Sequence, residues 1–276
     1  MARILITGGS SVVGDYLLPR LAAAGHEAIV LSRRPPAGPQ WRQLDAAQSS
    51  VWSAAPDGVS HLIHLAPLPL LAKVLPAAPA SLRRVVAIGT TSVFTKSASA
   101  SAKDQHLVRD QRRAEEGLTA FCQERGIDYT LLRPTLVYDG RRDKNVARIA
   151  VLVRRLRFFP VAAPARGLRQ PLHADDLAAT CMAALDARGS HSYELAGGER
   201  LSYRAMVERI FAAQHLKPRV LPLPVALYRA AIVLARVLPR YRGLTPEVAD
   251  RMNQDMVFDY AEAACDLGFA PREFSP

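Results

Sequence analysis

Short runs of apolar residues alternate with helical patterns along the first half of the chain. The runs that predict buried strands are residues 3–7, 27–32, 61–65, 84–88 and 129–133. Apolar residues recur at helical spacing over about 13–24 and 107–121, and a glycine closes each of these helices. Continuous apolar strands separated by helices are typical of a parallel sheet covered on both faces, with right-handed crossovers. The sequence therefore predicts an α/β fold with a doubly wound parallel sheet.

The pattern becomes less regular and more basic after about residue 139. Residues 139–169 contain nine Lys or Arg residues and two acidic residues. We therefore predict a core formed by residues 1–138, to which 170–187 return. A smaller C-terminal lobe is expected to comprise 139–169 and 188–276.

The composition excludes several classes of protein. With 49% hydrophobic and 22% charged residues among 276, the chain is neither wholly disordered nor a coiled coil. Its three cysteines lie far apart and form no Cys-x-x-Cys pair, so we expect no disulfide and no metal site. No signal peptide pattern is visible, and prolines and arginines interrupt the longest apolar stretch, 221–239. We expect a reduced, cytoplasmic protein without a transmembrane segment.

The net charge of +11 rests almost entirely on arginine, since only five of the 36 basic residues are lysines. Arginine suits phosphates and carboxylates, although a GC-rich genome would also enrich it. A nucleic-acid partner is disfavoured, because no recognition motif and no interleaved aromatic residues accompany the basic cluster. A small anionic substrate and a merely solvated arginine face both stay open. The apolar helix predicted at 225–238 either packs on the lobe or contacts an anionic membrane peripherally.

A glycine-containing turn joins the first predicted strand to the first predicted helix. Its sequence, Thr7-Gly-Gly-Ser-Ser-Val-Val-Gly14, allows a tight turn and a close approach of the backbone to a ligand. The helix N-terminus adds free N–H groups and a positive dipole end, which suit a pyrophosphate. The residues predicted to bind it are Gly8, Ser10, Ser11, Val12, Val13 and Gly14.

This turn resembles the TGxxGxxG signature of the short-chain dehydrogenase/reductases, in particular the extended and atypical branch called the NAD-dependent epimerase/dehydratase family. Thr7, Gly8 and Gly14 match the signature, and Ser11 replaces its middle glycine. The resemblance implies a Rossmann-like fold with a smaller C-terminal substrate lobe. It also implies a nicotinamide dinucleotide cofactor.

Other segments resemble the family in the same order along the chain. Residues 61–66 look like the strand that walls the adenine ribose, which implies contacts from Leu65, Ala66 and Pro67. Residues 131–138 are similar to the family's LRPxxVY, whose backbone lies beside the nicotinamide; this implicates Pro134 and Leu136. Residues 169–176 and 193–198 match further family segments.

The residues after the second strand favour NADP(H) over NAD(H). An acidic residue there usually binds the ribose 2′-hydroxyl of NAD, whereas arginine accommodates the 2′-phosphate of NADP. This strand ends in Ser32-Arg33-Arg34, with no acidic residue before Asp45. Two exposed arginines without a ligand are the alternative. Asp45 itself resembles the family's adenine-contacting acid.

The catalytic residues that the resemblance implies are only partly present. Thr90, in the segment 88–94, occupies the place of the family's catalytic Ser or Thr. The family's proton shuttle is a Tyr whose pKa is lowered by a Lys four residues later. No Tyr-x-x-x-Lys occurs in this chain; alignment places Leu107 and Gln111 at the two positions.

Two side chains are candidates to replace the missing tyrosine. His106 is next to the vacant position, and Tyr138 lies in the segment 131–138. Adjacent helical residues point about 100° apart, so His106 would need a shift of the helix. A surface histidine and a packed tyrosine are the alternatives.

Two functions follow as expectations. The first is an oxidoreductase or epimerase/dehydratase on a small anionic substrate such as a nucleotide sugar, with Thr90 orienting the reacting oxygen. The second is a catalytically silent NAD(P)H-binding sensor or assembly factor, which the missing Tyr and Lys favour. Either protein would be a monomer or a homodimer.

Overall fold

The computed structural model describes residues 2–34, 36, 38–44, 51–52, 55, 57–97, 99, 101–237 and 245–276, and they form two compact units. The first unit comprises Met1–Pro134, Ala174–Leu195 and Asp259–Ala270. The second comprises Thr135–His173, Ala196–Phe258 and Pro271–Pro276.

These units differ from the expected boundaries in the last third of the chain. Residues 188–195 and 259–270, expected in the lobe, belong to the first unit. The reason is that β11 (His191–Leu195) pairs with β6 (Asp128–Pro134) of the first unit. The two strands are parallel, in register from His191↔Thr130 to Leu195↔Pro134. Conversely, 135–138 and 170–173 belong to the second unit, where β7 (Val137–Tyr138) pairs with β10 (Leu172–His173).

A seven-stranded parallel sheet forms the centre of the first unit. Its order is β11-β6-β5-β4-β1-β2-β3. Besides β6 and β11, the sheet contains β1 (Arg3–Thr7), β2 (Glu27–Ser32), β3 (Trp41–Gln43), β4 (His61–His64) and β5 (Arg84–Ile88). Chain order reverses between β1 and β4, which is the topological switch point where doubly wound sheets bind ligands. The predicted α/β fold with a doubly wound parallel sheet is confirmed.

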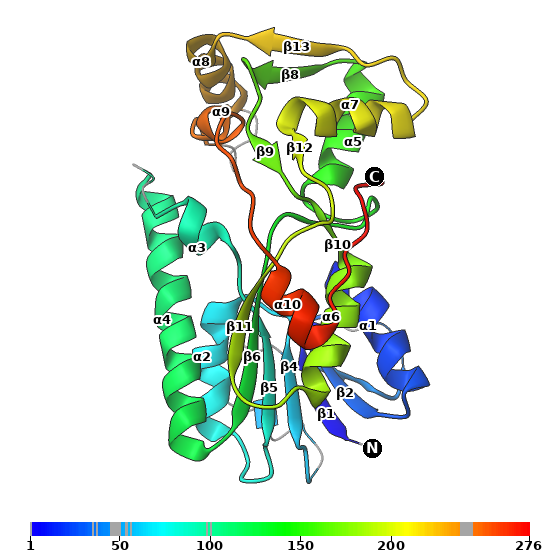
Figure 1. Ribbon diagram of the computed structural model, residues 1–276, viewed down its shortest axis with the longest axis vertical. Coiled ribbons are helices and arrows are strands. Elements are labelled where there is room, and N and C mark those ends of the chain that lie inside the picture. Colours follow the sequence, from blue (N-terminus) through cyan, green and yellow to red (C-terminus); the bar gives the residue numbers. More distant parts are fainter. Residues whose placement is uncertain are drawn as a thin grey trace. The chain divides into compact units, whose positions relative to one another are not determined.

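Helices cover both faces of this sheet (Figure 1). On one face lie α1 (Val12–Ala23) and α6 (Ala174–Asp186), and on the other α2 (Leu71–Val74) and α4 (Ala102–Arg125). Smaller elements are the 3-10 turns η2 (Leu68–Leu70) and η3 (Leu75–Ala77), and the helices α3 (Ser92–Thr95) and α10 (Ala261–Leu267). Gly126 ends α4 in the left-handed conformation, at φ 62°, as its sequence position predicted.

The second unit combines short strand pairs with helices. In it β8 (Phe159–Ala162) pairs with β13 (Val220–Leu223), and β9 (Leu168–Arg169) pairs with β12 (Leu201–Ser202). Its helices are α5 (Val146–Leu156), α7 (Tyr203–Ala213), α8 (Val225–Ala235) and α9 (Val248–Arg251). A core with Val153, Val161, Val207 and Phe211 fully buried holds α5 and α7 against β8.

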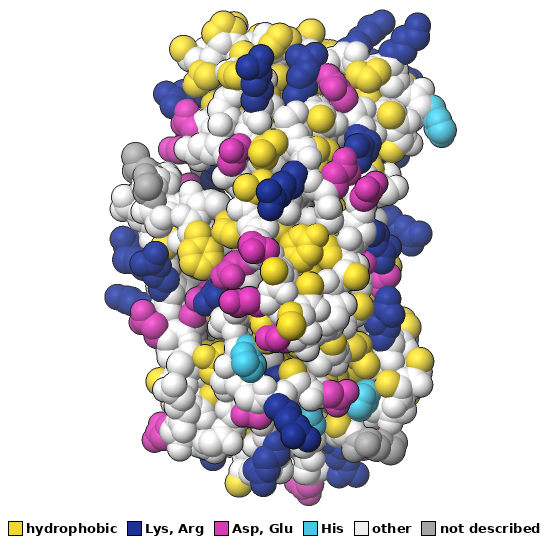
Figure 2. Space-filling view, in the orientation of Figure 1, with side chains coloured by type: hydrophobic (Ala, Val, Ile, Leu, Met, Phe, Trp, Pro, Cys, Tyr) yellow, Lys and Arg dark blue, Asp and Glu magenta, His cyan; other side chains and the backbone are white. Residues whose placement is uncertain are grey.

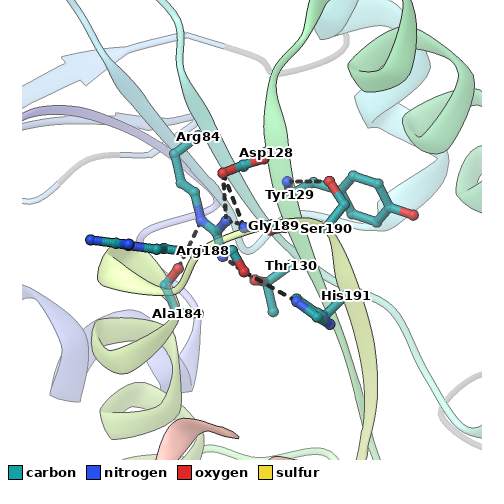
Figure 3. A network of polar contacts seen from close by, with 9 residues as sticks. All are labelled: Arg84, Asp128, Tyr129, Thr130, Ala184, Arg188, Gly189, Ser190 and His191. Atoms are coloured by element: carbon teal, nitrogen blue, oxygen red, sulfur yellow. Dashed lines mark hydrogen bonds and ion pairs between the residues drawn. The ribbon is translucent and has the colours of Figure 1, made fainter.

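A buried arginine, Arg84, connects β5 and β6 with the segments that precede β11 (Figure 3). Arg84 donates to the carbonyl oxygens of Ala184 at 2.9 Å and Gly189 at 2.7 Å. It also donates to the Thr130 hydroxyl, while the Asp128 carboxylate lies 3.9 Å away. Burial lowers the pKa of Arg84, and the carboxylate charge of Asp128 opposes that change. One side chain thus joins β5, β6, the end of α6 and the turn before β11.

Candidate functional site

The turn between β1 and α1 requires glycine at two points. Gly8 has φ +74°, and a Cβ there would lie 2.5 Å from the backbone nitrogen of Ala66. A Cβ on Gly14 would lie 1.9 Å from the carbonyl oxygen of Gly9. Both distances are far below any van der Waals contact, so this backbone geometry excludes a side chain at either position. We call this close-packed turn, with Gly8 and Gly14, the cradle.

The first turn of α1 presents backbone donors at this cradle. Ser11 is the N-cap, and its hydroxyl oxygen accepts from the Gly14 N–H at 3.2 Å. The N–H groups of Val12 and Val13 belong to the first turn, where helical N–H groups have no acceptor inside the helix. These donors and the positive end of the helix dipole suit an anion. The cradle and this N-terminus therefore fit a dinucleotide pyrophosphate.

The end of β4 is held against the turn by a buried histidine. His64 Nδ1 lies 2.7 Å from the Thr7 hydroxyl, and its Nε2 lies 3.2 Å from the Pro67 carbonyl oxygen. Because only a donor can serve a carbonyl, Nε2 carries the proton and Nδ1 accepts from Thr7. Burial lowers the pKa of His64 to about 4, so the ring is neutral near pH 7. It positions the segment Leu65–Pro67 beside the cradle.

The residues after β2 lie next to the same turn. The buried Ser32 donates its hydroxyl to Ser10 at 3.0 Å and accepts from the Arg34 N–H at 3.2 Å. Arg33 and Arg34 are exposed. The guanidinium groups of Arg33 and Arg34 are therefore exposed at this edge of the site. The last residue of β2 is Ser32, and an acidic residue is not found there. Asp45 lies outside the described residues.

The segment after β5 places two threonines with different roles. Thr90 is half-buried, and its hydroxyl oxygen accepts from the Ser92 N–H at 3.1 Å, so its O–H can still donate. Thr91 is buried and donates to the Pro134 carbonyl oxygen at 3.2 Å, which joins the ends of β5 and β6. Leu136 follows in the second unit and is half-buried.

Three predicted positions lie on α4. His106 is exposed on its outer side, with Nε2 3.2 Å from an oxygen of Asp110. Leu107 and Gln111 are half-buried, and the Gln111 Oε1 is buried without a hydrogen-bond partner among the described residues. His106 thus contacts Asp110 at the surface. The buried amide oxygen belongs to Gln111, the residue that the sequence comparison set against the family's catalytic lysine.

Tyr138 is a core residue of the second unit. It is fully buried, its hydroxyl oxygen accepts from the Ser275 N–H at 3.1 Å, and its ring packs edge-on against His173 and Phe274. This is the packed tyrosine that the sequence left open as the alternative.

A charged cluster that the sequence did not single out lies at the end of β6. Arg133 donates to Glu115 on α4 at 2.8 Å and to Glu194 on β11 at 3.2 Å, and its guanidinium lies over the Phe94 ring. Burial would lower the pKa of Arg133, but the hydrogen bonds and charges of the two glutamates outweigh it and raise that pKa. The only signal was the arginine of the segment 131–138, because its partners are distant in sequence.

The described part of the chain lacks two further features. No three side chains of His, Cys, Asp or Glu come together there as a metal centre requires. No helix in the described part of the chain is long and apolar enough to cross a membrane.

Comparison with known proteins agrees with this geometry. Residues 4–72 match the model of the NAD dependent epimerase/dehydratase family. These residues contain the glycine turn and β4. The uncharacterized protein y4nG of Sinorhizobium fredii is 24% identical, over 97% of this chain and 74% of its own length.

Solved structures show the same fold across the chain. MoeE5 in complex with UDP-glucuronic acid and NAD has a TM-score of 0.74 at 19% identity, over 99% of this chain and 95% of that one. The UDP-N-acetylglucosamine 4-epimerase from Bacillus cereus has a TM-score of 0.75 at 16% identity, with 99% and 92% covered. The predicted resemblance to the NAD-dependent epimerase/dehydratase family is therefore confirmed over residues 4–72, and the chain shares its fold with these solved structures.

Proposed function

We propose that the first unit binds a nicotinamide dinucleotide at the switch point of its sheet. The observation that carries this proposal is the cradle at Gly8 and Gly14, where a single Cβ would collide with backbone. The two positions bracket the passage from β1 into the first turn of α1, and in dinucleotide-binding turns this is the place where the backbone approaches the pyrophosphate. The Val12 and Val13 N–H groups would hold the pyrophosphate, and Leu65–Pro67 would wall the adenosine side.

The cofactor we propose is NADP(H) in preference to NAD(H). Arg33 and Arg34 are exposed beside Ser32, so their guanidiniums can bind a ribose 2′-phosphate in a charge-assisted contact. Calorimetric titration with NADPH and NADH tests this, on the wild type and on Arg33→Ala and Arg34→Ala. Losing one such contact should weaken NADPH binding by about 1.5–3 kcal/mol and leave NADH binding nearly unchanged.

Arg112→Ala is the matched control, because Arg112 is an exposed arginine on α4. It should leave both affinities as they are. Equal affinity for NADPH and NADH, unaffected at Arg33 and Arg34, would refute the preference without touching dinucleotide binding itself.

The reaction we propose is oxidation, reduction or epimerisation of a small anionic substrate such as a nucleotide sugar. MoeE5 and related structures contain UDP-sugars with NAD, and the second unit carries 20 basic against 8 acidic residues. The bound nicotinamide supplies hydride transfer. Thr90 keeps an O–H free to donate to the reacting oxygen of the substrate, and this makes it the positioning hydroxyl.

A second function, silent dinucleotide binding by a sensor or assembly factor, is favoured by one specific observation. Leu107 cannot move a proton. The amide oxygen of Gln111 is buried without a partner among the described residues, and a neutral amide cannot lower the pKa of a phenol. These residues would preserve cofactor binding while removing acid–base assistance, which is worth about 10²–10⁴-fold in rate.

Restoring the aligned pair separates the two functions. Leu107→Tyr with Gln111→Lys should raise NADPH-dependent turnover of a nucleotide-sugar panel if only the shuttle is missing. Either change alone should do less, since the lysine acts through the tyrosine. Brisk turnover by the wild type would contradict silent binding, and its loss in His106→Ala would identify a replacement acid. No turnover in any form, with tight NADPH binding, would leave the silent protein.

A further inference from the structure

Helix α8 of the second unit exposes an apolar face. Its inner side packs on the unit's core through Val225, Tyr228 and Ile232. On the outer side, Leu227 is 55%, Val233 56% and Leu234 74% exposed. The side chains of this outer face are Ala226, Leu227, Ala230, Ala231, Val233 and Leu234.

At 100° per residue these six positions span about 160° of the helix circumference without a charged or polar side chain. Arg229 and Arg236 lie at one border of the arc, and Arg229 pairs with Asp250 at 2.6 Å. A helix face in water normally carries polar residues, and contiguous exposed apolar surface marks an interaction site. Val237, 73% exposed just beyond the helix, extends the same face.

The strands next to α8 add exposed apolar and basic side chains. β13 runs directly into α8, and Leu221 on it is 45% exposed. The register Phe159↔Val220 sets the start of β8 beside the start of β13, so the residues that precede the two strands are neighbours, at the strand ends opposite the one from which α8 begins. Those residues include the exposed Leu156 and Phe158 and five exposed cations, namely Arg154, Arg155, Arg157, Lys217 and Arg219.

These residues form what we call the docking edge: the outer face of α8, Leu221, Leu156, Phe158 and the five cations. In Figure 2 the corresponding end of the second unit shows apolar side chains with Lys and Arg beside them. Exposed apolar side chains together with cations are the composition of surfaces that lie in a bilayer interface, with apolar groups among the acyl chains and cations at the lipid phosphates.

The charge of the second unit selects among the possible occupants. It holds 20 basic and 8 acidic residues, whereas the first unit holds 16 and 17. A second copy docked through the same edge would bring two strongly positive surfaces together, which like-charge repulsion opposes. An anionic bilayer complements the charge and covers the apolar face. We propose that the docking edge binds peripherally to anionic membranes.

Vesicle co-sedimentation of the full chain tests this. We expect binding to phosphatidylcholine vesicles with 30% phosphatidylglycerol, at least tenfold weaker binding to pure phosphatidylcholine, and weakening with salt. Leu234→Glu combined with Leu227→Glu should reduce binding about tenfold or more. Both side chains face outward, so the circular dichroism spectrum and melting temperature should stay unchanged.

Two controls and one alternative complete the design. Ala72→Glu with Ala102→Glu introduces the same two charges at exposed apolar positions of the first unit, outside the docking edge, and should have little effect. Arg154→Glu with Arg155→Glu should weaken binding to anionic vesicles, whereas Arg112→Glu with Arg113→Glu on α4 should not. Absence of binding to anionic vesicles, or binding that ignores the Leu227 and Leu234 changes, would overturn the proposal. A second copy would be the occupant if the protein bound no vesicles and light scattering showed a dimer that the Leu227 and Leu234 changes dissociate. That result would also overturn the proposal.

Discussion

The two units are alike in having a buried arginine that donates to backbone carbonyl oxygens, but they differ in the charge of their surfaces. In the first, Arg84 is buried and donates to the carbonyl oxygens of Ala184 and Gly189. In the second, Arg169 is equally buried; it donates to the carbonyl oxygens of Gln254 at 2.8 Å and Arg251, and it lies over the Tyr203 ring. Each unit thus uses one arginine to satisfy backbone oxygens of a distant segment.

Their surfaces differ because the first unit balances its cations and the second does not. Arg133 meets two glutamates, and the first unit as a whole has 16 basic and 17 acidic residues. The second has 20 and 8, with most of its excess on exposed arginines. The buried arginines of the two units make similar contacts, so the difference in net charge lies at the surface, where it would favour an anionic partner for the second unit.

The largest effect should come from Gly14→Ala, which acts on the first unit alone. The new Cβ would lie 1.9 Å from the Gly9 carbonyl oxygen, so the turn must move away from its ligand-binding geometry. We expect loss of measurable dinucleotide binding in calorimetry. Gly117→Ala is the matched control, since a Cβ there meets nothing within 4 Å. It should keep binding and add about 0.5–1 kcal/mol of helix stability. Equal affinity in the two variants would refute the role of the cradle.

The next effect tests whether the two buried arginines are equivalent. Arg84→Met and Arg169→Met should each destabilise the protein by about 3 kcal/mol or more, because several buried oxygens lose their donor. Hydrogen exchange should localise the loss of protection to β5, β6 and β11 for Arg84, and to β9 and the segment around Gln254 for Arg169. Loss spread evenly over both units in each variant would show that they unfold as one body.

A smaller effect should appear as a pH dependence that belongs to the first unit. His64 has a pKa of about 4 when folded and about 6.5 when unfolded, so the unfolded chain binds the extra proton between these values. The free energy of unfolding should fall as the pH decreases from 6.5 to 4, by about 3 kcal/mol at most. Denaturant titrations across that range should show a shallower fall for His64→Gln, which keeps polar groups without this titration. Parallel profiles would contradict the assignment.

Much of the first unit could be predicted because its signals are local. The apolar runs at 3–7 and 84–88 became β1 and β5 with the same bounds, and Gly126 ends its helix as expected. The glycine turn from Thr7 to Gly14 was likewise visible in its own sequence. Such elements are defined by neighbours a few residues away.

Contacts between distant residues could not be predicted in this way. The bond from Thr7 to His64 and the cluster of Arg133 with Glu115 and Glu194 require the order of strands in the sheet. The return of 188–195 and 259–270 to the first unit was missed for the same reason. A five-residue strand in a basic region gives no local sign of the sheet it joins.

The division of the first unit into three stretches of chain has a consequence for synthesis on the ribosome. Its sheet lacks an edge strand until residues 191–195 have emerged, and α10 follows only at 261–267. Strands β1 to β6 must therefore wait, with the edge of β6 unpaired, while Thr135–His173 of the second unit and α6 are translated. Unpaired strand edges are prone to association with other chains. The nascent chain is thus most vulnerable to aggregation between the exit of β6 and that of β11, and a truncation before residue 191 would leave that edge open permanently.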